Sequence, residues 1–453
     1  MIETWRARLG AATGAAIGLG LLLPASVAAH SLNATYESRL PLAVYLIGAA
    51  ITVALSFAFV ITRDVRAAAP STDAPGSLPP AAVRRGLQAI GLVGWTWIVA
   101  QGIAGGSSNG EVATLFLWVY GWVGIAILSA VIGPVWHFVD PFSTLHDLGA
   151  WLLARLGVRG WDPAEYPERL GRWPAVIGLA LFIWLELVVL AGPETLFVVV
   201  IGYTAFTLAM MAQFGRDAWR SRGETFTVWF RLLGRLAAFA LVDEDGRVRR
   251  RPFASGLMEP GWTWADVSLV ALGVGSILFD GLSQTQIYFD LFGTPHVVLS
   301  TILLVGFLAI VVGAAGAVGR TVGLAATGAG LLPIAVGYLV AHYFTYLLID
   351  GQRIRIAISD PFQRGWDLLG TAFHEPTSDF LAPGLVWTVQ LAAVVGGHML
   401  GAWGGHVVAA AEAPPGMDAA GLRLRQLPLA VVMVGLTTLT LWSLGQAIVV
   451  SPD

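Results

Sequence analysis

The chain contains no cysteine and no lysine, and few of its residues are charged. Without cysteine it cannot form a disulfide, a thiolate metal site, an iron–sulfur cluster or a cysteine nucleophile. All 26 basic residues are arginine, which excludes a Schiff-base lysine and with it a retinal protein or a pyridoxal phosphate enzyme. No basic stripe suited to nucleic acid is present, so no nucleic-acid partner is expected.

Charged residues make up only 12% of the 453 residues, whereas 56% are hydrophobic. Soluble domains are about one quarter charged, so this composition predicts a protein whose main partner is the lipid bilayer. The common soluble-enzyme motifs (HExxH, GxSxG, the P-loop and a GxGxxG between a strand and a helix) are also missing. Their absence disfavours an ATP-driven pump.

The N-terminal residues have the pattern of a secretory signal. Arg6 and Arg8 precede the apolar stretch Leu19 to Leu23, and Val27-Ala28-Ala29 supplies small residues for cleavage. We expect residues 1–29 to be a signal peptide or, alternatively, a first membrane helix. Cleavage would make His30 the N-terminus, and its amine and ring together are a known type of copper ligand.

Apolar stretches long enough to span a bilayer recur ten times after this segment. The sequence therefore predicts an all-α, polytopic transmembrane bundle of about ten helices. The stretches are 41–62, 87–106, 112–136, 174–192, 194–213, 264–283, 296–316, 321–349, 383–408 and 428–450.

The arginines predict how these helices are oriented. With the N-terminus inside, 22 of the 26 arginines fall in inner segments, as the positive-inside rule requires. We expect a multi-pass protein of a bacterial cytoplasmic membrane, whose first retained helix starts outside if the signal is cleaved. The longest polar segment, 214–262, holds an amphipathic stretch from Phe226 to Phe239 and a turn at Asp245-Gly246 that suggests a hairpin. It separates two sets of five spans, at 30–213 and 263–453.

One short pattern occurs in both sets, 220 residues apart. Asp140-Pro141-Phe142 is followed by Asp147, and Asp360-Pro361-Phe362 is followed by Asp367 at the same spacing. Each copy follows the third span of its set, so the two copies should lie on opposite sides of the membrane, as in an inverted repeat. Coincidence is the alternative, because Asp-Pro commonly begins helices. If the repeat is real, these segments are expected to act as gates, with Asp350 and Gln352 contributing to a polar lid.

Four ionisable residues lie within predicted spans, where such residues are costly and often functional. They are Glu186, Asp280, His342 and His398. Together they could bind a substrate or ion in one cavity, hold a divalent metal through His342, His398 and an acid, or relay protons. The alternatives are four unrelated buried polar groups, or a haem held between His342 and His398. Near His398, the repeated Gly397, Gly401 and Gly405 predict a face against which another helix packs closely.

Several segments together resemble a family of polytopic bacterial membrane proteins, some members of which are named fenitrothion hydrolase. The resemblance covers nearly the whole chain and implies, for some members, cleavage of an organophosphate ester. It rests on His30, Arg39-Leu40-Pro41-Leu42, Gly133-Pro134-Val135-Trp136, Phe279-Asp280-Gly281-Leu282-Ser283, Ala341-His342-Tyr343, Ser359-Asp360-Pro361-Phe362 and Gly365-Trp366-Asp367-Leu368.

Three functions remain open from the sequence. The repeat favours a secondary transporter or permease for a small solute or metal ion, using the intramembrane histidine and carboxylate site. The resemblance favours a membrane-embedded, metal-dependent hydrolase, in which the metal would activate water. The paired histidines and His30 permit a haem or copper redox subunit. The sequence identifies neither the substrate nor any partner subunit.

Overall fold

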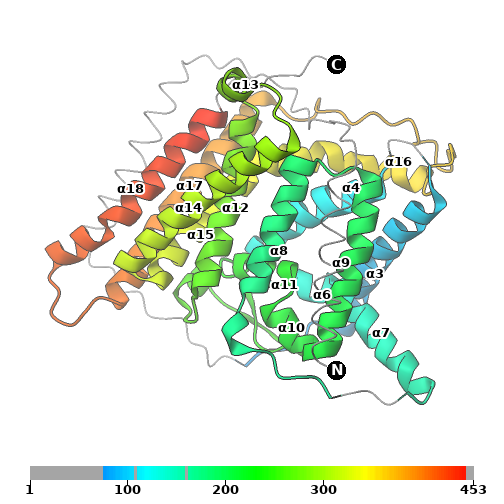
Figure 1. Ribbon diagram of the computed structural model, residues 1–453, viewed down its shortest axis with the longest axis horizontal. Coiled ribbons are helices and arrows are strands. Elements are labelled where there is room, and N and C mark those ends of the chain that lie inside the picture. Colours follow the sequence, from blue (N-terminus) through cyan, green and yellow to red (C-terminus); the bar gives the residue numbers. More distant parts are fainter. Residues whose placement is uncertain (1–74, 107–109, 159–161, 445–453) are drawn as a thin grey trace.

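A computed structural model describes residues 75–106, 110–158 and 162–444 (Figure 1). The first half contains α3 (Ala81–Ala104), α4 (Val112–Thr114), η1 (Leu115–Ile125), α5 (Ala126–Val131), α6 (Val135–Val139), α7 (Pro141–Arg155), η2 (Glu168–Leu170), α8 (Trp173–Trp184), η3 (Leu185–Val189), α9 (Pro193–Phe214), α10 (Arg216–Arg222) and α11 (Thr225–Leu233). A hairpin of β1 (Phe239–Leu241) and β2 (Val248–Arg250) follows, and then η4 (Ser255–Met258). The second half contains α12 (Trp264–Ser283), α13 (Gln286–Phe292), α14 (Val297–Val322), α15 (Leu324–Ile349), η5 (Asp350–Arg353), α16 (Ile354–Ser359), α17 (Pro383–Ala411) and α18 (Ala419–Leu444).

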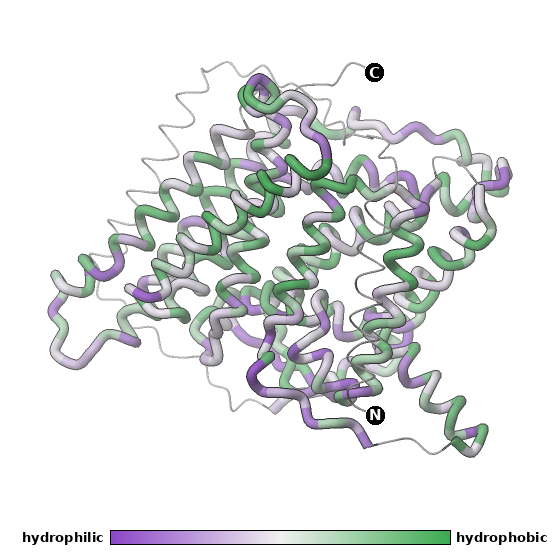
Figure 2. Tube along the Cα trace, viewed as in Figure 1, coloured by the Kyte–Doolittle hydropathy of each residue, from purple (hydrophilic) through white to green (hydrophobic). Residues whose placement is uncertain are grey.

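Within this described part, eight helices are long and apolar enough to cross a membrane. Their apolar stretches run along the middle of the molecule, and polar residues concentrate at its two ends (Figure 2). The chain is therefore a multi-pass, mainly helical membrane protein. The eight are Ala81–Ala104, Val112–Val131, Pro193–Phe214, Trp264–Ser283, Val297–Val322, Leu324–Ser359, Pro383–Ala411 and Ala419–Thr440; Trp173–Val189 is a shorter apolar helix.

Two predicted spans end earlier in the structure, and each has a backbone reason. The span predicted over 112–136 stops at Val131, because Gly133 adopts a φ of 138° and Pro134 follows it. The span predicted over 174–192 stops at Val189, because Leu190 adopts the left-handed conformation, with a φ of 50°. The predicted span 41–62 and the signal segment 1–29 lie outside the described residues.

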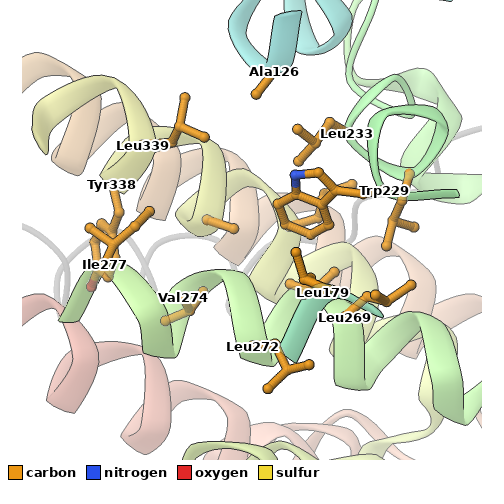
Figure 3. Close-up of a cluster of buried hydrophobic side chains, with 14 of the residues drawn as sticks. Ala126, Leu179, Trp229, Leu233, Leu269, Leu272, Val274, Ile277, Tyr338 and Leu339 are labelled. Carbon is orange, nitrogen blue, oxygen red and sulfur yellow. The ribbon is translucent and has the colours of Figure 1, made fainter. Parts of the chain in front are cut away.

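The core is centred on α12 and α15, which are buried over most of their length. Leu269, Val274 and Tyr338 lie in a cluster with Trp229 of α11 (Figure 3). Trp229 is almost fully buried although α11 is too short to span a membrane, so this helix extends the core at one end. The amphipathic stretch predicted from Phe226 to Phe239 begins within α11, which ends at Leu233, and Trp229 is one of the buried residues of this helix.

Helices α15 and α17 pack closely through glycine, as the sequence predicted. A Cβ added at Gly397 would lie 2.6 Å from the carbonyl oxygen of Pro333, and one at Gly401 would lie 2.3 Å from that of Gly330. A Cβ at Gly405 would lie 3.3 Å from the carbonyl oxygen of Ala326. Small residues let two helix backbones approach in this way, so the prediction of a close packing face is confirmed.

The polar segment between the two halves forms α10, α11 and the hairpin at one end of the molecule, which we call the arginine-rich end. The antiparallel pairs are Phe239–Arg250, Ala240–Arg249 and Leu241–Val248, which confirms the hairpin predicted around Asp245-Gly246. Helices α13 and α16 lie at the opposite end (Figure 1).

Candidate functional site

Three helices bring Glu186, Asp280 and His342 together near the end opposite the arginine-rich end. His342 Nε2 lies 2.9 Å from Asp280 Oδ2. The hydroxyl of Tyr343 donates to the same Asp280 oxygen at 3.1 Å, and it lies 3.5 Å from Glu186 Oε1. Two acids, an imidazole and a phenol therefore form one cluster, with the Tyr343 hydroxyl between the two carboxylates.

The ends of α12 and α15 position Asp280 and His342. Asp280 lies in the last turn of α12, where its other oxygen, Oδ1, accepts a hydrogen bond from Gln284 Nε2 at 2.7 Å. His342 and Tyr343 are consecutive on α15, and their rings meet edge to face with centroids 4.6 Å apart. The side chains of Asp280 and His342 are 16% and 10% exposed, so the pair is largely buried but keeps some surface exposure.

Glu186 lies in a short segment whose backbone departs from α-helical geometry. It lies in η3, a π-helical segment that continues α8, and Leu190 closes this segment in the left-handed conformation. Wider helical turns of this kind recur at functional sites, and a left-handed leucine stores local strain. The geometry directs Glu186 toward Tyr343 of α15 instead of continuing a regular helix.

One oxygen of Glu186 is left without a partner. Its Oε2 atom is buried and accepts no hydrogen bond from the described part of the chain. A buried acceptor without a donor is unfavourable by about 1–3 kcal/mol. A donor such as a water molecule would satisfy this oxygen.

His398 lies apart from this cluster. It is fully buried on α17, where Nδ1 is 2.8 Å from the carbonyl oxygen of Val394 and Nε2 is 3.4 Å from the Tyr338 hydroxyl. Among the described residues, no three histidine or acidic side chains are grouped closely enough to hold a metal ion. The joint metal site of His342, His398 and an acid therefore gains no support from this geometry, and His30 lies outside the described residues.

The four residues of the second half that the sequence predicts to form a lid or gate hold a folded loop at the same end as the cluster. Asp350 pairs with Arg353, and Gln352 bonds to Thr377 at 2.8 Å. Asp360 accepts from the backbone of the turn that follows it, and Asp367 accepts from Ser359 Oγ at 2.8 Å. The carbonyl oxygen of Pro361 also accepts from Trp97 and Gln101, which attaches this loop to α3.

The first Asp-Pro-Phe copy lies at the arginine-rich end and has a different local structure. Asp140 is buried, caps the N-terminus of α7 through Phe142 and Ser143, and lies 3.3 Å from Arg220. Asp147 is exposed and pairs with Arg216. Whereas Asp140 begins a helix, Asp360 closes a turn. The two copies thus lie at opposite ends, but their contacts do not match one to one.

Sequence reasoning missed a second buried polar network around Glu224. This fully buried carboxylate caps α11, accepts from Tyr203 at 2.5 Å, and lies 3.4 Å from Trp136 Nε1. Beside it, Arg220 Nη2 donates to the carbonyl oxygen of His137. Burial and the charges of Arg220, Arg231 and Arg216 lower the pKa of His137 to about 3. Glutamate is not among the residues preferred at a helix N-cap, so no sequence signal pointed to this capping role.

The fold and the cluster define a multi-pass membrane protein with a carboxylate–histidine–tyrosine site near one end of its spans. No family model, curated protein or solved structure matches the chain.

Proposed function

We propose that this protein is a secondary transporter that moves a small solute or cation through the Asp280–His342–Glu186 site and couples this movement to protons. One observation carries the proposal: two carboxylates and an imidazole from three separate helices meet around the Tyr343 hydroxyl. Ionisable groups in membrane spans are expensive and usually line substrate or proton pathways.

The charge of the cluster depends on how many protons it holds. With all three groups deprotonated it is negative, and with all three protonated it is positive. A cation would therefore favour the deprotonated cluster and would displace protons from it. The unpartnered Oε2 of Glu186 is the atom at which such an exchange would begin.

We further propose that the arginine-rich end faces the cytoplasm of a bacterial cell and that the cluster opens toward the outer side. The positive-inside rule supports this orientation. In this scheme, the loop that contains Asp350, Gln352, Asp360 and Asp367 forms the outer lid, and Asp140 and Asp147 belong to the inner gate. The placement of α7 and α16 at opposite ends agrees with that division (Figure 1).

The test measures proton flux in liposomes that contain the purified full-length protein and an internal pH-sensitive dye. Mn²⁺, Zn²⁺ and a small organic cation are added in turn, under an imposed pH gradient. We expect Asp280→Asn to reduce the flux by about tenfold or more, because a hydrogen bond to a charged group contributes about 1.5–3 kcal/mol. Glu186→Gln and His342→Ala should have effects of the same kind.

The matched control is Asp290→Asn. Asp290 lies at the same end, in α13, and accepts a hydrogen bond from Gln286 at 2.7 Å with the same spacing as the Asp280–Gln284 pair. It lies outside the cluster, so the flux should be unchanged. Equal losses in Asp280→Asn and Asp290→Asn would contradict the proposal.

A second candidate function is hydrolysis of an organophosphate ester, favoured by the Asp280–His342 contact. An aspartate at 2.9 Å can orient an imidazole as a general base, which then activates water. The family resemblance points to the same chemistry. An aryl dialkyl phosphotriester that releases nitrophenol is the appropriate probe. Turnover lost in His342→Ala but retained in Asp290→Asn would favour the hydrolase over the transporter if no cation drives proton flux.

A further inference from the structure

A small cavity lies beside His342, on the side of α15 that faces α12 and α18. Its volume is about 10 Å³, and its polar lining consists of His342, Tyr338, Thr440 and Ser443. A cavity of this size, with several polar neighbours, has just enough room for a single water molecule. Tyr338 and Ile277, which both line the cavity, lie next to each other in the core (Figure 3).

On its other side, Tyr338 connects the cavity to His398. The Tyr338 hydroxyl is 3.4 Å from His398 Nε2, and His398 Nδ1 is 2.8 Å from the carbonyl oxygen of Val394. A carbonyl oxygen only accepts, so a hydrogen on Nδ1 is donated to Val394, and Nε2 of that tautomer can accept from the Tyr338 hydroxyl, which also lies within hydrogen-bonding reach of Thr437 and Thr440. With the hydrogen on Nδ1, Nε2 is the basic nitrogen of His398 and lies toward the phenol, and the backbone of Met433 also hydrogen-bonds to the ring.

The glycine face explains why these two side chains meet. Gly337 and Gly397 immediately precede Tyr338 and His398, and a Cβ added at Gly337 would lie 3.3 Å from the Cα of Gly397. Contact between the two glycines brings the next residue of each helix into hydrogen-bonding range. The packing motif therefore also positions a polar pair inside the membrane.

We propose that His398 is a buried proton acceptor, linked to the Asp280–His342 pair through one water molecule and Tyr338. This inference rests on the proposed function, because the outer cluster supplies the proton. The recorded links are 2.9 Å from Asp280 to His342, the shared cavity, and 3.4 Å from Tyr338 to His398.

The transfer balances without any further reactant. An imidazolium at His342 gives a proton to the cavity water, and the water gives a proton to the Tyr338 oxygen. At the same time, the original Tyr338 O–H bond breaks and its proton bonds to His398 Nε2. His342 and Tyr338 end neutral, His398 ends as an imidazolium, and the bond from its Nδ1–H to Val394 is kept. The outer site can then bind a cation while the displaced proton stays within the protein.

The alternative is that Tyr338 and His398 merely join α15 to α17, as buried hydrogen-bonding groups in membrane proteins often do. The two interpretations differ in the rate at which protons reach His398. A static contact needs the helices to open before the imidazole can exchange, whereas a path through water and Tyr338 does not.

The test is NMR of the full-length protein labelled with ¹⁵N-histidine, with the His398 signal assigned by its loss in His398→Gln. After a jump to acidic pH or into D₂O, we expect His398 to respond with the outer cluster, and Tyr338→Phe to slow that response at least tenfold. Thr440→Val, which removes a hydroxyl from the cavity wall, is the second variant and should also slow it. Tyr288→Phe removes a buried phenol of α13, whose ring contacts Phe279 and Phe292, and should leave the rate unchanged.

An unchanged rate in both Tyr338→Phe and Thr440→Val would overturn the path, as would equal slowing by Tyr288→Phe. This outcome is separable from failure of the proposed function. If Asp280→Asn abolishes proton flux while exchange at His398 is independent of Tyr338, the transporter proposal is supported and the proton path through Tyr338 is refuted. If exchange at His398 depends on Tyr338 but no added cation drives proton flux, the proton path is supported and the transport proposal is refuted.

Discussion

Replacement of Gly401 by alanine should separate α15 from α17. The new Cβ would lie 2.3 Å from the carbonyl oxygen of Gly330 and 2.9 Å from the terminal methyl of Met433. The methionine end can rotate away, but the backbone oxygen can move only with its helix. Restoring an ordinary contact of about 3.4 Å requires the two backbones to part by about 1 Å.

The expected loss follows from two opposing effects. Overpacking of a tight contact destabilises by about 1–3 kcal/mol, and the better helix propensity of alanine returns up to about 1 kcal/mol. With the full propensity gain, Gly401→Ala should therefore lower the free energy of unfolding by up to about 2 kcal/mol. Urea unfolding in detergent, followed by tryptophan fluorescence, measures this difference.

Gly396→Ala is the matched control, because it lies on the same helix and its added Cβ meets nothing within 4 Å. We expect it to be neutral or slightly stabilising. The same stability for both variants would refute the close approach of α15 and α17, and with it the explanation for the Tyr338–His398 contact.

Two further predictions concern the arginine-rich end. Asp140→Asn should destabilise the protein by about 3–5 kcal/mol, because it leaves the buried Arg220 without its charged partner. Asp147→Asn, at the exposed pair with Arg216, should destabilise it by less than about 1 kcal/mol. Similar unfolding midpoints for the two variants would contradict this prediction. The folded pKa of His137, about 3, lies below the ordinary value of 6.5, so the unfolded chain binds the extra proton between these pH values. Stability should therefore fall as pH drops through this window, by up to about 1.4 kcal/mol per pH unit from this residue. Unfolding measured from pH 4 to 7 should show a shallower slope in His137→Gln, and parallel slopes would argue against a buried, neutral imidazole.

The sequence alone determined features that depend on near neighbours along the chain. Hydropathy is a local property, so the spans at 264–283 and 383–408 could be located within a few residues. The Asp245-Gly246 turn and the Gly397, Gly401 and Gly405 face could be identified because each requires a particular residue type at a particular spacing. Glu186, Asp280 and His342 stood out because a charge within a span is unfavourable wherever the helix lies.

Only the tertiary structure decided which of these groups meet. The sequence predicted no role for the Tyr343 side chain, since a tyrosine in an apolar helix is common, yet its hydroxyl lies between Asp280 and Glu186. His398 looked equivalent to His342, but it contacts Tyr338 instead of Asp280 or Glu186 because α15 and α17 are held together by glycine. Periodicity predicts the face on which a side chain lies, but not the rotation and depth of the neighbouring helix. Those depend on packing between residues far apart in the chain, and they set the distances on which the chemistry of this site depends.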